Sequence, residues 1–243
     1  MYNLQKFTLQ EMTQCGIHLR ELNSNSNNME EVANKIVNYF YKNFINQKTN
    51  EKDFVLVRFF KTHSYENLGL KLQEYAQMRL GKALPSPQTK CLTLLATRGD
   101  LPEWNSRNKS TEHQAIPLIS EQLLTQTPMI SQLLRQFGLK TTTLLNPDPK
   151  LLVDLEQKTY NVFYVPQALG CKYIPAQEKF IIPHKIQSVL GFGGILPDSN
   201  LFVVILFSRV QIPQDTATLF KVLALSVKMA ILPFSEDAIF TTI

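Results

Sequence analysis

Residues 186–207 read IQSVLGFGGILPDSNLFVVILF, two apolar runs on either side of the turn-forming sequence PDSN at 197–200. Two such runs joined by a short turn predict an antiparallel β-hairpin. The second run, 201–207, is apolar at every position, which is typical of a strand covered on both faces. We therefore expect this hairpin to lie inside a sheet, with the rest of the chain packed against it.

Composition indicates an ordered chain with a substantial core. The 243 residues are 44% hydrophobic, enough for one large domain or two small ones. The net charge is +5, but the basic residues are scattered between acids and apolar runs. Because nucleic-acid binding requires a basic face or stripe, we do not expect a nucleic-acid partner.

The cysteines and the first residues indicate a reducing compartment. Cys15, Cys91 and Cys171 are far apart and form no CxxC motif. The start of the chain, MYNLQKFTLQEM, lacks the apolar segment of a secretory signal. The most apolar long stretch, 222–232, contains Lys228 and is expected to be a buried helix rather than a membrane span. These features predict a cytoplasmic protein without a membrane partner.

Hydrophobic periodicity predicts several further elements. Helices are expected at 4–22, 28–46, 68–80, 120–137 and 213–232, with a shorter one at 150–158; additional strands are expected at 54–60, 91–97 and 160–165. Pro128 should kink or split the fourth helix, and Gly138 should follow its end. The polar stretch 23–28 separates a leading helix at 1–22 from a main domain at 28–232, which a tail at 233–243 follows.

The last predicted helix carries apolar residues on two faces. One face contains Leu219, Val222 and Ser226, and the other contains Phe220, Leu223, Val227 and Ile231. One face can cover the sheet, which leaves the other for a second helix from this chain or from a partner.

The C-terminal third resembles a GAF domain. KIQSVL at 185–190 is similar to the family's G-I-R-S-x-L phrase, and the last helix carries the L-x-x-L-A-x-x-x-A pattern through Leu219, Leu223, Ala224, Val227 and Ala230. The chain departs from the family at Gln187, where Arg is common, and at the sequence FGG at 192–194. Across most of the chain, phrases such as MEEVANKIV, LVRFFKTH and TYNVFYVPQALG resemble the long N-terminal sensory region of bacterial, notably cyanobacterial, multidomain sensor histidine kinases.

This resemblance implies an α+β, GAF/PAS-like fold. Its central antiparallel sheet would have about five or six strands, long terminal helices would cover one face, and a ligand pocket would lie on the other. It also implies a homodimer formed through the terminal helices and a histidine kinase as output, in trans or in a longer chain.

No motif in the sequence specifies a metal or a covalent cofactor. The four histidines are widely spaced, and no HxxxH or HExxH occurs. A haem would need only one axial histidine, for which His184 is the candidate. In GAF domains that carry a bilin, a cysteine commonly precedes His or Tyr, but Lys172 separates Cys171 from Tyr173. The cofactor is therefore left unassigned.

Two groups of residues are candidates for a ligand pocket. The first group lies near the end of the first predicted strand and consists of Arg58, Lys61 and His63. Aromatic and polar residues crowd the segment before the hairpin: Tyr160, Asn161, Tyr164, Tyr173 and His184. Aromatic walls with a few polar groups suit a small ligand, and the two cations would favour an anion. The glycines at 191, 193 and 194 are expected to leave room above the sheet for that ligand.

Three functions remain open at this stage. The first is a non-enzymatic sensory module that binds a small ligand or partner and signals through dimeric terminal helices. The second is a protein–protein interaction module without a ligand. The third is an enzyme; some GAF domains reduce methionine sulfoxide, but they need several neighbouring cysteines. The spacing of the cysteines favours a chain that is not an enzyme.

Overall fold

The structure is a computed structural model that describes residues 1–47, 49–81, 84–119, 127–138, 162–235 and 239–240. Its strands are β1 (Phe54–Ser64), β2 (Lys90–Gly99), β3 (Ala115–Pro117), β4 (Val162–Val165), β5 (Ser188–Ile195) and β6 (Leu201–Ser208). They form one sheet in the order β3-β2-β1-β6-β5-β4, and every neighbouring pair is antiparallel. The predicted hairpin is confirmed as β5 and β6, both buried along their whole length.

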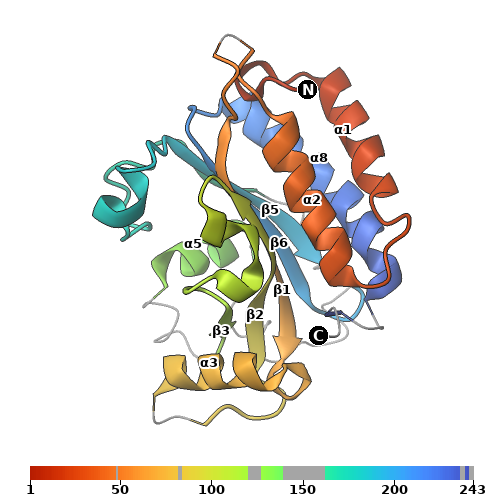
Figure 1. Cartoon of the computed structure of the whole chain (residues 1–243), viewed down its shortest axis with the longest axis vertical. Coiled ribbons are helices and arrows are strands. Elements are labelled where there is room, and N and C mark those ends of the chain that lie inside the picture. Colours follow the sequence, from red (N-terminus) through yellow and green to blue (C-terminus); the bar gives the residue numbers. More distant parts are fainter. Residues whose placement is uncertain (48, 82–83, 120–126, 139–161, 236–238, 241–243) are drawn as a thin grey trace.

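Helices flank this sheet on both faces, which confirms the α+β prediction. The α-helices are α1 (Leu9–Glu21), α2 (Met29–Asn43), α3 (Leu70–Leu80), α5 (Pro128–Gln136) and α8 (Gln214–Ile231). Figure 1 shows α1, α2 and α8 on one side of the sheet and α5 on the other, with α3 across one end. Short helical turns connect these elements: η1 (Leu4–Lys6), η2 (Tyr65–Asn67), η3 (Pro102–Asn105), η4 (Arg107–Lys109), η5 (Gln177–Ile181) and η6 (Leu232–Phe234).

The alternation of side chains along β6 separates two hydrophobic cores. Phe202, Val204 and Leu206 belong to the core beneath α2 and α8, whereas Val203 and Ile205 belong to the core on the opposite face. Successive side chains of a strand point to opposite faces, so an uninterrupted apolar strand can serve both cores at once.

Local sequence signals set several helix ends. Asn28 accepts a hydrogen bond from the amide of Glu31 at the start of α2, as a helix N-cap residue does. Pro128 does not kink a longer helix within the described residues but occupies the first turn of α5, where its missing amide proton costs nothing. Gly138 follows α5 with a φ of 72°, as expected of a residue that ends a helix.

Other boundaries differ from the sequence analysis. β1 continues through Ser64 because its last residues still pair with β2, and the short strand β3 lies in a stretch for which no strand was predicted. The predicted helix at 150–158, and the part of the predicted helix at 120–126, lie outside the described residues. The division into 1–22, 28–232 and 233–243 stays a prediction.

α1 packs on α8 and shares its core. A Cβ at Gly16 would lie 2.9 Å from the hydroxyl oxygen of Ser226, so the two helices approach closely there. This contact places Ser226 beneath α1, so a second helix of this chain covers part of the α8 face that contains Ser226, as the sequence analysis allows. The helical stretch 214–234 is long and apolar enough to cross a membrane by length and composition, a test that core helices also pass, and 44% of its most apolar window is buried inside the structure.

Candidate ligand cavity

A cavity of about 300 Å³ lies on the face of the sheet opposite α2 and α8. Its floor is formed by Leu56 and Phe60 of β1 with Ile205 and Phe207 of β6. Its walls are contributed by η3, β3, α5, η5 and the stretch 111–113. An apolar cavity with a few polar groups has the character of a small-ligand site, although its volume is at the lower end of the usual range.

Arg58 is the charged group on the cavity floor. It lies on β1 beside Ile205, and its Nε is buried without a hydrogen-bond partner among the described residues. Burial lowers the pKa of Arg58 to about 10, and the negative charge of Glu112 opposes that shift. Since a guanidinium with a pKa of about 10 stays protonated at pH 7, Arg58 offers a positive charge to the cavity.

The other two predicted cations of β1 do not join Arg58. Lys61 and His63 lie three and five residues after Arg58 along β1, and neither lines the cavity. Lys61 instead pairs with Asp198 in the β5–β6 turn, and the ring of His63 lies 5.3 Å from that of Phe240. The prediction of one cationic cluster is therefore corrected, because neighbours along a strand alternate between its two faces.

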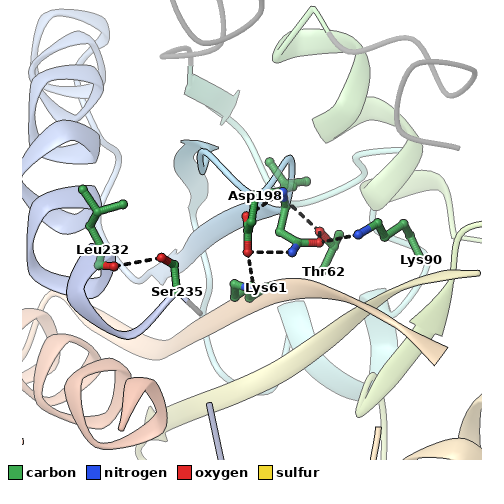
Figure 2. Close-up of polar contacts among 8 residues, drawn as sticks. Lys61, Thr62, Lys90, Asp198, Leu232 and Ser235 are labelled. Atoms are coloured by element: carbon green, nitrogen blue, oxygen red, sulfur yellow. Dashed lines mark hydrogen bonds and ion pairs between the residues drawn. The ribbon is translucent and has the colours of Figure 1, made fainter. Parts of the chain in front are cut away.

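Lys61 takes part in a polar cluster that attaches the β5–β6 turn to β1 and β2 (Figure 2). Its Nζ lies 3.4 Å from Asp198 Oδ2, and its side chain is 1% exposed. Asn200 lies at the centre of the cluster: its side-chain oxygen accepts hydrogen bonds from Thr62 at 3.1 Å and from Lys90 at 2.8 Å. Burial lowers the pKa of Lys61, and the charge of Asp198 partly offsets this. The cluster explains Lys61 as a structural residue.

His63 should make the stability of the domain sensitive to acid. Burial, followed by the charges of Lys61 and Lys90, lowers its pKa well below 6.5. As the pH falls below about 6.5, the unfolded chain therefore binds a proton that the folded chain excludes, and the free energy of unfolding decreases. We expect urea unfolding at pH 7.5, 6 and 5 to show this loss, and His63→Phe to reduce it.

The exposed His18 of α1 provides the matched control. His18→Asn removes a histidine from the surface and controls for the loss of a histidine as such. A His63→Phe protein with the full pH dependence would contradict the assignment of the effect to His63.

The predicted tyrosines are not gathered around the cavity. The hydroxyl of Tyr164 donates a hydrogen bond to the carbonyl of Ile212, and its ring packs against the core on the α8 side. Tyr173 lines a separate hollow with Cys171, where Lys172 lies over its ring. Tyr160 and Asn161 lie outside the described residues.

His184 lies behind the cavity wall rather than in the cavity. Its ring is 4.7 Å from the ring of Trp104, and Trp104 lines the cavity. On its other side, His184 lines a polar hollow of about 400 Å³ that also contains the ion pair between Arg209 and Asp100. His184 is therefore a support for Trp104 in this structure.

Residues that the sequence analysis did not select complete the cavity. Trp104 of η3 packs on Gly99, where an added Cβ would lie 2.8 Å from the indole ring. Phe180 of η5 meets this ring edge-on at 5.6 Å. The position of Trp104 in a long loop was the available signal, since long loops often carry binding residues; for Phe180 no comparable signal exists in the sequence.

His113 and Glu112 form the polar side of the cavity. His113 has a φ of 61°, an uncommon backbone conformation for a residue other than glycine, and its amide donates to the Tyr75 hydroxyl at 2.8 Å. Burial, and then the charge of Arg58, lower the pKa of His113 to about 4, so its ring is neutral at pH 7. A second hollow, which Tyr75 and Arg79 line, shares His113 and Glu112 with the cavity and adjoins it there.

The glycines of β5 do not open space for a ligand. A Cβ at Gly191 would lie 3.3 Å from Phe163, and a Cβ at Gly193 would lie 2.0 Å from the carbonyl oxygen of Phe202. For Gly191 and Gly193, the prediction that they leave room above the sheet is wrong because β4, α5 and the neighbouring strand already occupy these positions.

The cysteines lie apart in the folded chain. Cys15 is in the core beneath the helices, Cys91 packs near α3, and Cys171 borders the core on the cavity's face. Burial raises the pKa of both Cys15 and Cys91 to about 12. Within the described part of the chain, no group of three His, Cys, Asp or Glu residues is arranged to hold a metal ion.

Comparisons with known proteins give only distant structural similarities. No family model matches the sequence, and no curated protein matches it. The free methionine-R-sulfoxide reductase from Neisseria meningitidis in complex with its substrate is 9% identical, with a TM-score of 0.47 over 93% of this chain and 90% of that one. The fRMsr of Staphylococcus aureus in its reduced form is 8% identical, with a TM-score of 0.45 over 90% and 94%.

A GAF domain is also among the similar structures. The GAF domain from Acinetobacter phosphoenolpyruvate-protein phosphotransferase is 10% identical, with a TM-score of 0.43 over 93% of this chain and 94% of that chain. All three TM-scores are below 0.5, so we base no function on these similarities.

The reductases nevertheless correct one prediction. Because enzymes are among the similar structures, the expectation that this chain is not an enzyme is withdrawn. The structure itself has the arrangement that the GAF resemblance implies: a six-stranded antiparallel sheet, long terminal helices over one face and a cavity on the other. The chain has a GAF-like fold.

Proposed function

We propose that the chain is a GAF-like regulatory module that binds a small molecule in the cavity above β1 and β6. The observation that carries this proposal is the buried Nε of Arg58, which has no partner among the described residues and belongs to a residue on an otherwise apolar floor. A buried polar group without a partner is costly, and a ligand would remove that cost. The alternative of an interaction module without a ligand leaves Arg58 unexplained.

Native mass spectrometry of the protein purified from its source tests the proposal. We expect a bound mass in addition to the polypeptide, and an absorption spectrum would reveal a haem or bilin. Ala176→Trp would obstruct the cavity from an exposed position at its rim and should abolish the bound mass. A wild-type protein that carries no bound mass, and that binds no added small molecule, would contradict the proposal.

We further propose that the module forms a homodimer through α8. Its outward side exposes Val222, Leu225 and Met229, each about half exposed, and Ile17 of the adjoining α1 is 46% exposed. These residues recur at helical spacing, and burial of such a stripe against a second copy would remove it from water.

The oligomeric state tests this interface. We expect the wild type to sediment as a dimer and the double variant Val222→Glu/Leu225→Glu to sediment as a monomer with unchanged helix content. Lys221→Glu, at a neighbouring exposed position, is the matched control and should remain dimeric. A monomeric wild type, or a dimeric double variant, would contradict the interface.

The output follows from the sequence resemblance alone. We infer a cytoplasmic histidine kinase as partner, either in trans or in a longer polypeptide. A ligand that alters the packing of α1 on α8 would change the relative position of these helices, and a kinase coupled to them would respond to that change.

A further inference from the structure

We propose that the ligand of this cavity is a small carboxylic acid with an apolar or aromatic body, whose single carboxylate pairs with Arg58. This inference rests on the proposed function and narrows it to a chemical class. It follows from the unpartnered polar atoms, the charges around the cavity and the nature of its walls.

Two of the unpartnered polar atoms lie on one face of two neighbouring strands. Arg58 of β1 is paired with Thr97 of β2, so their side chains share a face of the sheet. The Nε of Arg58 and the hydroxyl oxygen of Thr97 are both buried without a hydrogen-bond partner among the described residues. A planar guanidinium with free N–H groups matches the two oxygens of a carboxylate.

The charges around the cavity favour an anion and limit its charge. Arg58 lies on the floor, and Lys179 is an exposed cation at the rim. Glu112 is the carboxylate whose charge acts on Arg58. Its side chain is 76% exposed, and its Oε2 lies 3.8 Å from Nδ1 of His113. Arg79 lines only the adjoining hollow. The guanidinium of Arg58 can neutralise one negative charge. A phosphate dianion carries two, so the cost of removing its second charge from water would have no compensating ion pair in the cavity.

The walls define the rest of the molecule. Trp104 and Phe180 present aromatic rings, and Met129, Ile130 and Ile116 present aliphatic groups. Such walls stabilise an apolar body through burial and aromatic contacts. At about 300 Å³, the cavity suits a compact body such as a single ring system.

Three matched probe series test the inference by calorimetry and ligand-observed NMR. The acids are 3-phenylpropionate and indole-3-acetate, their primary amides form the second series, and phenyl phosphate represents the dianion. We expect the acids to bind with an affinity about tenfold or more above that of the amides and of phenyl phosphate. Arg58→Gln should remove this preference while it leaves amide binding within about twofold.

Two variants separate the charge of Arg58 from a general loss of structure. Arg58→Lys should retain part of the preference for acids, and Lys179→Gln at the rim should retain all of it. Equal affinities for acids and amides would overturn the carboxylate inference, and so would an acid preference that survives in Arg58→Gln. In either case the cavity would still be the binding site if Ala176→Trp blocks all binding. If no probe of any series binds, the carboxylate inference fails, and the proposed function fails as well only if the protein purified from its source also carries no bound mass.

Discussion

Gly193→Ala is expected to unfold the domain or to lower its free energy of unfolding by about 4 kcal/mol or more. Gly193 lies in β5 opposite Val203, and an added Cβ would be 2.0 Å from the carbonyl oxygen of Phe202 and 2.9 Å from the Cα of Val203. These are backbone atoms of a central strand, which cannot move without breaking the β5–β6 ladder. Overpacking that a flexible side chain cannot relieve is costly.

Urea unfolding followed by circular dichroism measures this effect. Gly69→Ala is the matched control, because a Cβ at Gly69 would meet no atom within 4 Å. The control should stay within about 0.5 kcal/mol of the wild type. A Gly193→Ala protein as stable as the control would show that the two strands are not in this register.

Asp198→Ala is expected to cost about 3 kcal/mol of folding free energy. The substitution removes the anion beside Lys61, whose side chain is 1% exposed, and leaves that ammonium without a described counter-charge. It also removes two hydrogen-bond acceptors from the turn. The Asp198 carboxylate accepts one bond from the backbone amide of Asn200 at 2.9 Å and one from the side-chain amide of Asn200 at 2.8 Å. Most of the cost should come from the buried, unpaired charge.

A double-variant cycle separates these two contributions. Lys61→Met in the Asp198→Ala background should recover more than half of the lost stability, because the buried charge is then absent. Glu74→Ala, which removes an exposed acid of α3, is the matched control and should have little effect. If Lys61→Met worsens the Asp198→Ala protein, the cost does not originate in the buried ammonium.

Both effects depend on the β5–β6 hairpin, the part of the fold that the sequence indicates most directly. Its two apolar runs and its PDSN turn predict the positions of both strands within a few residues, and the apolar pattern of the second run predicts burial on both faces. The sequence does not reveal why Gly193 is required. That reason is the backbone of Phe202 across the ladder, which the strand pairing alone brings into contact.

The candidate site was only partly predictable. Arg58 was selected as a neighbour of Lys61 and His63, but the three were grouped by proximity along the chain. The structure keeps Arg58 in the cavity and gives Lys61 a partner 137 residues away in the chain. Trp104, Phe180 and His113 come from separate turns and loops, and only the packing of those segments over β1 and β6 brings them together.

The sequence by itself determined the elements that depend on local physics. Periodicity and capping residues specify α1, α2 and α8, and the apolar runs specify β1, β5 and β6. The sequence motifs of the C-terminal third indicate a GAF-like fold. Only the tertiary structure decided which side of each strand faces the cavity, because a single bulge or a shift of one residue exchanges the two faces. Arg58 and Lys61 are three residues apart and therefore lie on opposite faces of β1. Packing then decided that the face of Arg58 borders the ligand cavity and that Lys61 joins a structural ion pair.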